Sequence, residues 1–269
     1  MNFVDTHTHL YSEEFDPDRY AVVRNAVEKG VTRLILPAID LTYHERMMDL
    51  AKHYPGHCFP MIGLHPTSVK SNYREELDFI GNRLAEEREQ FYGIGEIGID
   101  LYWDKTHAKE QEDAFEIQLD WAVQYDLPVA IHTRNSFDIA TGIIRKKNDL
   151  RLKGIFHCFG GSKEQAKQAI ELGFLLGIGG IITYKNSGLQ RVVAETGLEH
   201  MVLETDAPWL PPVPHRGQRN ESSYIPLIAQ KIAEIKQLSI EEVAEKTTQN
   251  AISLFNLNNM RICLSKPPS

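Results

Sequence analysis

The first ten residues, MNFVDTHTHL (1–10), hold a short apolar run that ends in two histidines, His7 and His9. Side chains two residues apart on a β-strand point to the same side, so both imidazoles would face one space. Such a pair can bind a metal ion, and it can also be a pair of ordinary polar residues at a strand end. The pattern becomes informative because it recurs along the chain, and this recurrence decides the fold.

Short apolar or β-branched runs alternate with longer segments of helical periodicity. The runs cover residues 2–9, 31–39, 58–65, 91–99, 128–133, 154–157, 174–179 and 201–205. Alternation of strands and helices implies parallel pairing through right-handed crossovers. Eight such units in 269 residues predict an α/β fold of the (β/α)8 TIM-barrel type. A doubly wound open sheet is the alternative.

Helix-capping signals support this division of the chain. Asp16-Pro17 is typical of a helix start, and Gly30 follows the charged end of that helix. Ser162 to Gln165 and Ser239 to Glu242 both have the capping-box pattern. Residues 108–125 have an apolar face with charges elsewhere, which predicts a long amphipathic helix.

Composition limits the class of protein. We expect one barrel domain over residues 1–257 and a tail, residues 258–269, that is poorly ordered or non-native. Three widely spaced cysteines, Cys58, Cys158 and Cys263, indicate a reducing environment. With neither a signal peptide nor an apolar stretch of membrane-spanning length, we expect a cytoplasmic protein without membrane contact. A monomer without an obligate protein partner is the default for a closed barrel.

Polar side chains of the metal-binding types come at the carboxyl ends of six of the apolar runs. They are His7 and His9, His65, Glu96, His132, His157, and Glu204 with Asp206. A barrel gathers the carboxyl ends of its strands at one mouth, so we expect these side chains to share one site. Neutral imidazoles and carboxylates suit divalent ions such as Zn²⁺ and Mn²⁺, and carboxylates also suit Mg²⁺.

The number of these side chains exceeds the need of one tetrahedral ion. It suits two divalent ions about 3.5–4 Å apart that share a carboxylate. Glu96, which comes from the middle of the set, is the candidate for the shared carboxylate. The neighbouring glycines Gly93, Gly95 and Gly98 either allow close approach of the backbone or fill a tapered barrel interior.

Taken together, the motifs DTHTHL, GLHP, GEIGID, IHTR, FHCF and LETDAPWL resemble the TatD family of metal-dependent DNases. The resemblance runs from Asn2 to about Leu257. It implies a TIM-type barrel of the metal-dependent hydrolase kind and a divalent-metal-dependent deoxyribonuclease, typically with 3′–5′ exonuclease character. The metal ligands that it implies are His7, His9, Glu96, His132, His157 and Asp206.

The expected chemistry is two-metal activation of water against DNA phosphodiester bonds. Asp206 would bind metal and accept a proton, and His65 would donate to the phosphate or the leaving oxygen. Glu204 would either hydrogen-bond water or a ligand, or else orient a histidine.

Binding of the substrate is expected from side chains around the mouth. Arg134 would clamp a phosphate, since guanidinium matches its geometry. Tyr102, Trp103 and Trp209 would stack on bases or else plug loops, and the proline-rich loop 208–219 would form the rim. The further cations are Lys105, His107, Lys185, Arg216 and Arg219, of which Arg216 lies in the stretch expected nearest the substrate.

The formal net charge of −8 argues against a protein that coats nucleic acid with a basic face. Two divalent ions would supply about four positive charges at the mouth, which allows an acidic protein to bind the end of a DNA strand. The main alternative is an amidohydrolase that acts on a small amide, ester or lactone, because the same barrel performs that chemistry. A non-catalytic metal-binding barrel is the third possibility.

Overall fold

The computed structural model describes residues 1–258. Its parallel strands are β1 (Phe3–Asp5), β2 (Val31–Leu36), β3 (Cys58–Pro60), β4 (Ile94–Asp100), β5 (Val129–Arg134), β6 (Gly154–Phe156), β7 (Phe174–Ile178) and β8 (Met201–Leu203). Each of the eight predicted runs therefore overlaps a strand; most strands are shorter than their runs, and β4 and β5 each extend one residue beyond theirs. The predicted tail lies outside the described residues except for Asn258, as does Cys263, and the predicted domain limits stay a prediction.

The strands form two parallel sheets, β1-β2-β3 and β4 through β8 in order. Two backbone bridges join these sheets into a closed barrel. One seam is a parallel bridge between Ile62 and Ile94, just after β3. The other is a bridge between Thr8 and Ala207, which joins the first strand to the last. The predicted TIM-type barrel is confirmed, and closure at both seams excludes an open sheet.

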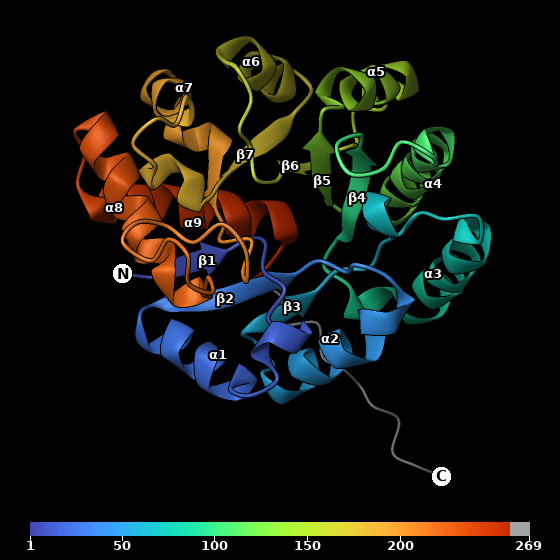
Figure 1. Ribbon diagram of the computed structural model, residues 1–269, viewed down its shortest axis with the longest axis horizontal. Helices are drawn as coiled ribbons and strands as arrows, with labels where there is room; N and C mark the ends of the chain where they lie inside the picture. The colour runs from blue at the N-terminus through green and yellow to red at the C-terminus, as the bar shows by residue number, and fades with distance from the viewer. Residues whose placement is uncertain (259–269) are drawn as a thin grey trace.

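Helices surround the strands (Figure 1). They are α1 (Arg19–Glu28), α2 (Leu41–His53), α3 (Tyr73–Glu87), α4 (Ala108–Tyr125), α5 (Phe137–Lys147), α6 (Lys163–Glu171), α7 (Leu189–Glu195), α8 (Ile225–Lys236) and α9 (Ile240–Phe255). The long helix predicted over residues 108–125 is confirmed. None of the helices in residues 1–258 has both the length and the apolar character that a membrane span requires.

The helix starts follow their capping residues in two of the three predicted cases. Both capping boxes are present, at Ser162 before α6 and at Ser239 before α9. The predicted start at Asp16-Pro17 is wrong, because α1 begins at Arg19. The Asp16 carboxylate instead binds the guanidinium groups of Arg19 and Arg46, so it does not cap the helix.

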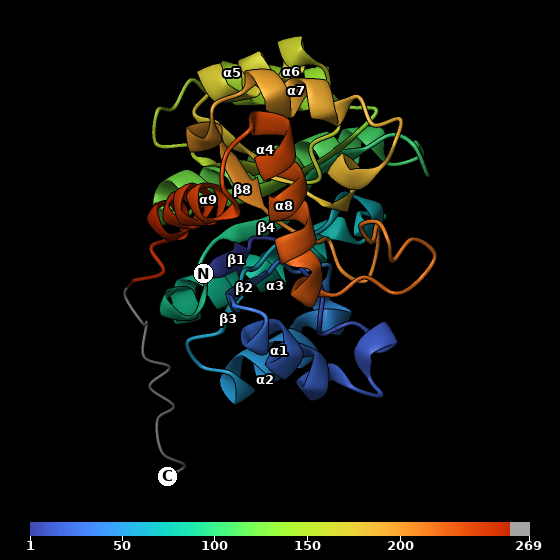
Figure 2. The same ribbon diagram turned by 90° about the vertical axis from the view of Figure 1, so that its left-hand side faces the viewer.

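Helix α9 covers one end of the barrel and lies at the same end as the N-terminus (Figure 2). Its Ala251 and Phe255 pack with residues that line the barrel interior near the amino ends of the strands. Those residues are Val4, Ile35, Phe59, Met61, Tyr92, Ala130, Ile155 and Val202. The amino ends of the strands are thus filled by apolar side chains, which leaves the carboxyl ends for polar chemistry.

Candidate metal centre

The segment that follows β1 stays alongside its neighbour far enough to bring His7 and His9 to the mouth of the barrel. Strand β1 ends at Asp5, so the predicted strand to His9 is too long by four residues. Backbone hydrogen bonds nevertheless continue the ladder pattern, because Asp206 N donates to His7 O and His9 N donates to Ala207 O. His7 and His9 therefore still face one space, as the spacing predicts.

Glu96 lies at the centre of the site, on β4, and is 2 % exposed. Its Oε2 is 2.9 Å from His7 Nε2 and 3.4 Å from His9 Nε2. Its Oε1 is 2.9 Å from His132 Nδ1 and 2.8 Å from His157 Nε2. Each oxygen of one carboxylate thus faces its own pair of imidazoles, which is the arrangement expected for a carboxylate shared by two ions.

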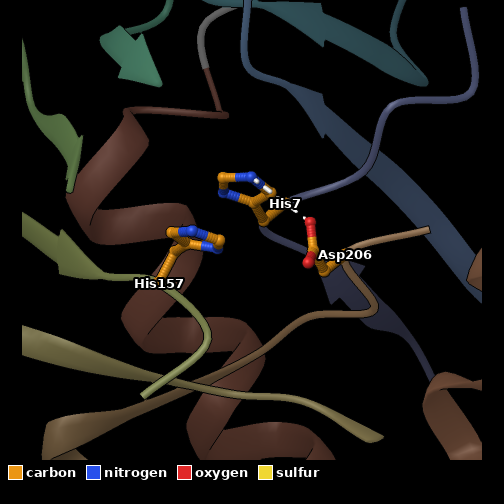
Figure 3. Close-up of side chains that lie close together, drawn as sticks. All are labelled: His7, His157 and Asp206. Carbon is orange, nitrogen blue, oxygen red and sulfur yellow. Dashed lines mark ion pairs between the residues drawn. The ribbon is translucent and has the colours of Figure 1, made fainter. Parts of the chain in front are cut away.

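Asp206 completes the side of the site that carries His7 and His9. Its Oδ1 is 3.8 Å from His7 Nε2 and 3.7 Å from His9 Nε2. Figure 3 shows His7, His157 and Asp206 turned toward one another from different strand ends. The rings of His7 and His157 stack with centroids 3.9 Å apart. The structure therefore brings all six predicted ligands into one cluster.

Hydrogen bonds fix which nitrogen of His9 faces the cluster. The Tyr11 hydroxyl donates its one proton to the Pro37 carbonyl oxygen, which can only accept. The hydroxyl oxygen must then accept from His9 Nδ1, 2.8 Å away, so that this nitrogen carries the proton. His9 consequently presents the lone pair of Nε2 to Glu96 and His7.

The same reasoning applies to His132. Its Nε2 lies 2.9 Å from Asp100 Oδ2 and donates to that carboxylate, so in the neutral ring the Nδ1 lone pair faces Glu96 and His157. Asp100 Oδ1 in turn accepts from the backbone N–H groups of Tyr102 and Trp103. Asp100 was not among the predicted site residues, although its place in GEIGID, four residues after Glu96 on one strand, was a usable signal.

His65 differs from these histidines. Its Nδ1 accepts the backbone N–H of Thr67 at 3.1 Å, so the proton of the neutral ring lies on Nε2. Nε2 therefore donates to Glu96 Oε1 at 3.1 Å. A nitrogen that carries a proton cannot bind a metal ion, and this tautomer favours the predicted role of His65 as a donor.

Glu204 lies behind His157 and is fully buried. Its Oε1 accepts the backbone N–H of Cys158 and is 3.7 Å from His157 Nδ1. This burial argues against the expected contact with water or a ligand in the mouth. Of the two roles considered for Glu204, the structure favours orientation of a histidine.

The charges of the cluster reflect its burial. Burial raises the pKa of Glu96, but the surrounding imidazoles of His157, His65 and His7 outweigh it and hold the pKa well below its ordinary value. Burial raises the pKa of Asp206 to about 6. Burial lowers the pKa of His7 well below its ordinary value. Burial also lowers the pKa values of His132 and His157, but the carboxylates of Glu96, Asp100 and Glu204 outweigh it and hold both pKa values above their ordinary value. The ionised Glu96 thus attracts positive charge into the centre, which a divalent metal would supply in place of the imidazole protons.

Two close nitrogen pairs show that the cluster fits metal ions. His7 Nε2 and His9 Nε2 are 3.2 Å apart, and so are His132 Nδ1 and His157 Nε2. Because His9 and His132 each present a lone pair, a cation near each pair would stabilise the contacts. Three groups of side chains have donor atoms within 4.8 Å of one another: His7, His157 and Asp206; His7, His9 and Glu96; and His65, Glu96 and His132.

Gly98 lets the backbone of β4 approach β5 beside the centre. Its φ is +141°, and a Cβ there would lie 2.0 Å from the carbonyl oxygen of His132. Of the two explanations considered for the glycines near Glu96, close approach of the backbone therefore applies at this position.

The other predicted substrate-binding residues lie outside the cluster. The Arg134 guanidinium lies over the Tyr102 ring, 3.9 Å from its centroid, and 5.1 Å from that of Trp103. The Arg216 guanidinium lies over Tyr184 at 4.4 Å. Trp209 contacts His9 edge to face at 5.3 Å.

One predicted cation is not free. Arg219 pairs with Asp18 at 2.7 Å and with Glu221 at 3.0 Å, so its charge is neutralised within the fold. Among the further cations, Arg219 is therefore not available to bind a substrate at the mouth.

A closed α/β barrel with imidazoles and carboxylates gathered at the carboxyl ends of its strands defines the class of metal-dependent hydrolases. The family model "TatD related DNase" matches residues 4–256. The uncharacterized metal-dependent hydrolase YabD of Bacillus subtilis is 36% identical over 94% of this chain and 99% of its own length. The chain therefore belongs to the TatD family and is a metal-dependent hydrolase.

Two further proteins are similar to this chain over nearly their whole length. A protein of Pantoea sp. named 3'-5' ssDNA/RNA exonuclease TatD is 31% identical over 94% of this chain and 99% of its own length. The crystal structure of YjjV, a TatD homologue of Escherichia coli, superposes with a TM-score of 0.89 at 31% identity. That match covers 94% of this chain and 98% of the YjjV chain.

Proposed function

We propose that this protein is a divalent-metal-dependent exonuclease that hydrolyses phosphodiester bonds from the 3′ end of single-stranded DNA. The observation that carries the proposal is the position of Glu96, whose two oxygens each face a separate pair of imidazole nitrogens at 2.8–3.4 Å. Support for nucleic acid as substrate comes from relatives named 3'-5' ssDNA/RNA exonuclease.

Six side chains would hold the metal ions. His7, His9 and Asp206 would bind one ion with Glu96 Oε2, and His132 and His157 would bind the second with Glu96 Oε1. When bound, Mg²⁺, Zn²⁺ or Mn²⁺ would neutralise phosphate charge and lower the pKa of the attacking water. Asp100, Tyr11 and Glu204 would orient His132, His9 and His157 respectively.

Two side chains of the chain itself act on the reacting oxygens. Asp206 takes a proton from the attacking water, whose oxygen forms the new bond to phosphorus. The bond that breaks joins phosphorus to the 3′ oxygen of the shortened strand; His65 Nε2–H donates a hydrogen bond to that oxygen, which takes its proton from solvent water. The products are a 3′-hydroxyl and a nucleoside 5′-monophosphate.

Exposed aromatic rings on the loop after Asp100 support a single strand of nucleic acid as the substrate. Tyr102 is 53% exposed and Trp103 is 69% exposed, on the loop that follows Asp100. Bases stack on such rings without regard to sequence. Arg134, stacked on the same two rings, would bind phosphate between successive bases.

The test compares metal-stripped and metal-reconstituted protein on 5′-labelled single-stranded DNA, its duplex, RNA of the same sequence, and a panel of lactones and amides. We expect metal-dependent shortening of single-stranded DNA one nucleotide at a time, and no shortening by the His132→Ala variant. If the reconstituted protein leaves each oligonucleotide intact but opens a lactone, the amidohydrolase alternative replaces this proposal.

A further inference from the structure

A cavity of about 610 Å³ lies between the segments that lead from β5 into α5 and from β6 into α6. Its lining residues belong to 133–139 and to 158–165. The first loop directly follows His132, and the second directly follows His157. A group bound to these two histidines would therefore lie at the inner edge of this cavity.

The cavity has the size and chemistry of a small-molecule site. Its volume lies within the range of about 300–1,000 Å³ that such sites have. Phe137 and the nearly fully buried Phe159 lie in its wall, and Asn135 and Asp138 supply polar groups. The cavity thus combines some apolar surface with several hydrogen-bonding groups, which suits the base and the sugar of a nucleoside.

Arg134 gives the cavity a cation that no carboxylate neutralises. Among residues 1–258, its guanidinium has no ion pair and no hydrogen bond, and its contacts are the rings of Tyr102 and Trp103. Its backbone is fixed at both ends, because Arg134 N donates to Ser136 Oγ and Leu101 N donates to Arg134 O. A phosphate next to the cavity would meet a cation that the backbone already positions.

We propose that this cavity binds the terminal nucleoside of the strand while the phosphate attached to its 5′ oxygen lies on the metal centre. This inference rests on the proposed function and adds the location of the leaving nucleotide. The loops 133–139 and 158–165 surround one nucleoside, and the rest of the strand leaves over Tyr102 and Trp103. Removal of one nucleotide at a time from an end then follows from the shape of the site.

Gly160 offers a way to narrow the cavity without disturbing the fold. It lines the cavity, and a Cβ built there meets no atom closer than 3.9 Å. Gly161 is not suitable for such a substitution, because a Cβ built there would lie 2.5 Å from Gln165 Oε1. Gly142, exposed on α5, has no atom within 4 Å of its Cβ and provides the matched control.

The test measures binding of deoxyadenosine 5′-monophosphate and of inorganic phosphate to the metal-loaded protein by equilibrium dialysis. We expect Gly160→Leu to weaken binding of the nucleotide at least tenfold and to leave binding of inorganic phosphate within twofold of the wild type. Gly142→Leu should match the wild type for both. Arg134→Gln, at an exposed position, should weaken nucleotide binding without a change in metal content.

The outcomes separate this inference from the proposed function. If Gly160→Leu binds the nucleotide as tightly as the wild type and digests single-stranded DNA with an unchanged KM, the cavity is not the nucleoside site. If the wild-type protein cleaves no oligonucleotide but binds the nucleotide through Gly160 and Arg134, the nuclease proposal fails while the assignment of the cavity stands.

Discussion

The chemistry of individual histidines in this protein is set by their hydrogen-bond partners. Tyr11 and Asp100 each hold the proton on the nitrogen that faces away from the cluster, whereas Thr67 holds the His65 proton on the nitrogen that faces it. These hydrogen bonds distinguish the proposed metal ligands His9 and His132 from the proposed hydrogen-bond donor His65. The positions of the histidines in the sequence do not reveal this distinction.

Replacement of Asp100 tests this separation. Its carboxylate serves the loop with Oδ1 and His132 with Oδ2, whereas an asparagine has only one accepting oxygen. We expect Asp100→Asn to weaken metal binding about 10–100-fold. Titration with Zn²⁺ against a competing chelator measures this effect. Asp104→Asn is the control, since the Asp104 side chain caps only Thr106 N of the same loop, and equal affinities of the two variants would contradict the role of Asp100.

Glu96 is expected to control the number of ions bound. Since each carboxylate oxygen faces one imidazole pair, Glu96→Ala would remove a ligand from both of the proposed ions at once. We expect the metal content, measured by inductively coupled plasma mass spectrometry after dialysis, to fall from two ions per chain to one or fewer. A variant that retains two ions would show that Glu96 is not shared.

His44 provides a test of pH dependence away from the metal centre. It is buried on α2 with its ring 5.7 Å from Phe79, and burial lowers its pKa below 6.5. The unfolded chain therefore binds a proton that the folded state excludes, so the free energy of unfolding falls as the pH drops below 6.5. Urea titrations at pH 5 and pH 7.5 should show a smaller pH effect in His44→Leu than in the wild type. An equal pH effect in both proteins would contradict this assignment.

At the scale of elements, α9 separates the apolar end of the barrel from the reactive end. Phe255 is 1% exposed and packs against strand residues such as Val4 and Val202. A barrel of this kind must fill its interior with side chains, and the last helix supplies part of that filling.

The contribution of α9 is measurable by truncation of Phe255. We expect Phe255→Ala to lower the free energy of unfolding by about 3–5 kcal/mol, because it leaves a cavity at the closed end. Ser253→Ala, at an exposed position of the same helix, should stay within about 0.5 kcal/mol of the wild type. Urea unfolding followed by circular dichroism distinguishes them, and equal stabilities would mean that α9 does not seal the barrel.

At the scale of the whole molecule, the metal ions would connect strands that are far apart in sequence. The proposed ligands come from β4 and β5 and from the loops after β1, β6 and β8. A ligand that binds only the folded state stabilises it, by about 2.7 kcal/mol at a concentration of 100 Kd.

Metal removal should therefore lower stability as well as activity. We expect EDTA to lower the Tm of the wild-type protein by several degrees and to abolish hydrolysis, with recovery of both when Zn²⁺ or Mn²⁺ is restored. The His132→Ala variant should show a smaller shift in scanning calorimetry. A wild-type Tm that does not respond to metal would contradict the cluster as a metal centre.

Much of the fold was predictable because its signals are local. Each strand overlaps a predicted apolar run, and the capping boxes at Ser162 and Ser239 mark the starts of α6 and α9. The errors arose where tertiary contacts compete with local signals, as at Asp16, whose carboxylate binds Arg46 from another helix. The cytoplasmic location and the monomeric state stay predictions.

The sequence alone determined the alternation of strands and helices and the residue types at the strand ends, since both depend on spacing of a few residues. Only the tertiary structure decided which oxygen of Glu96 faces which imidazoles, which nitrogen of each histidine carries the proton, and that Asp100 supports His132. These features depend on atoms brought within 3 Å or so from strands widely separated along the chain. His7 and His9 are near neighbours in sequence, but they form part of a metal centre because closure of the barrel places Glu96 and Asp206 beside them.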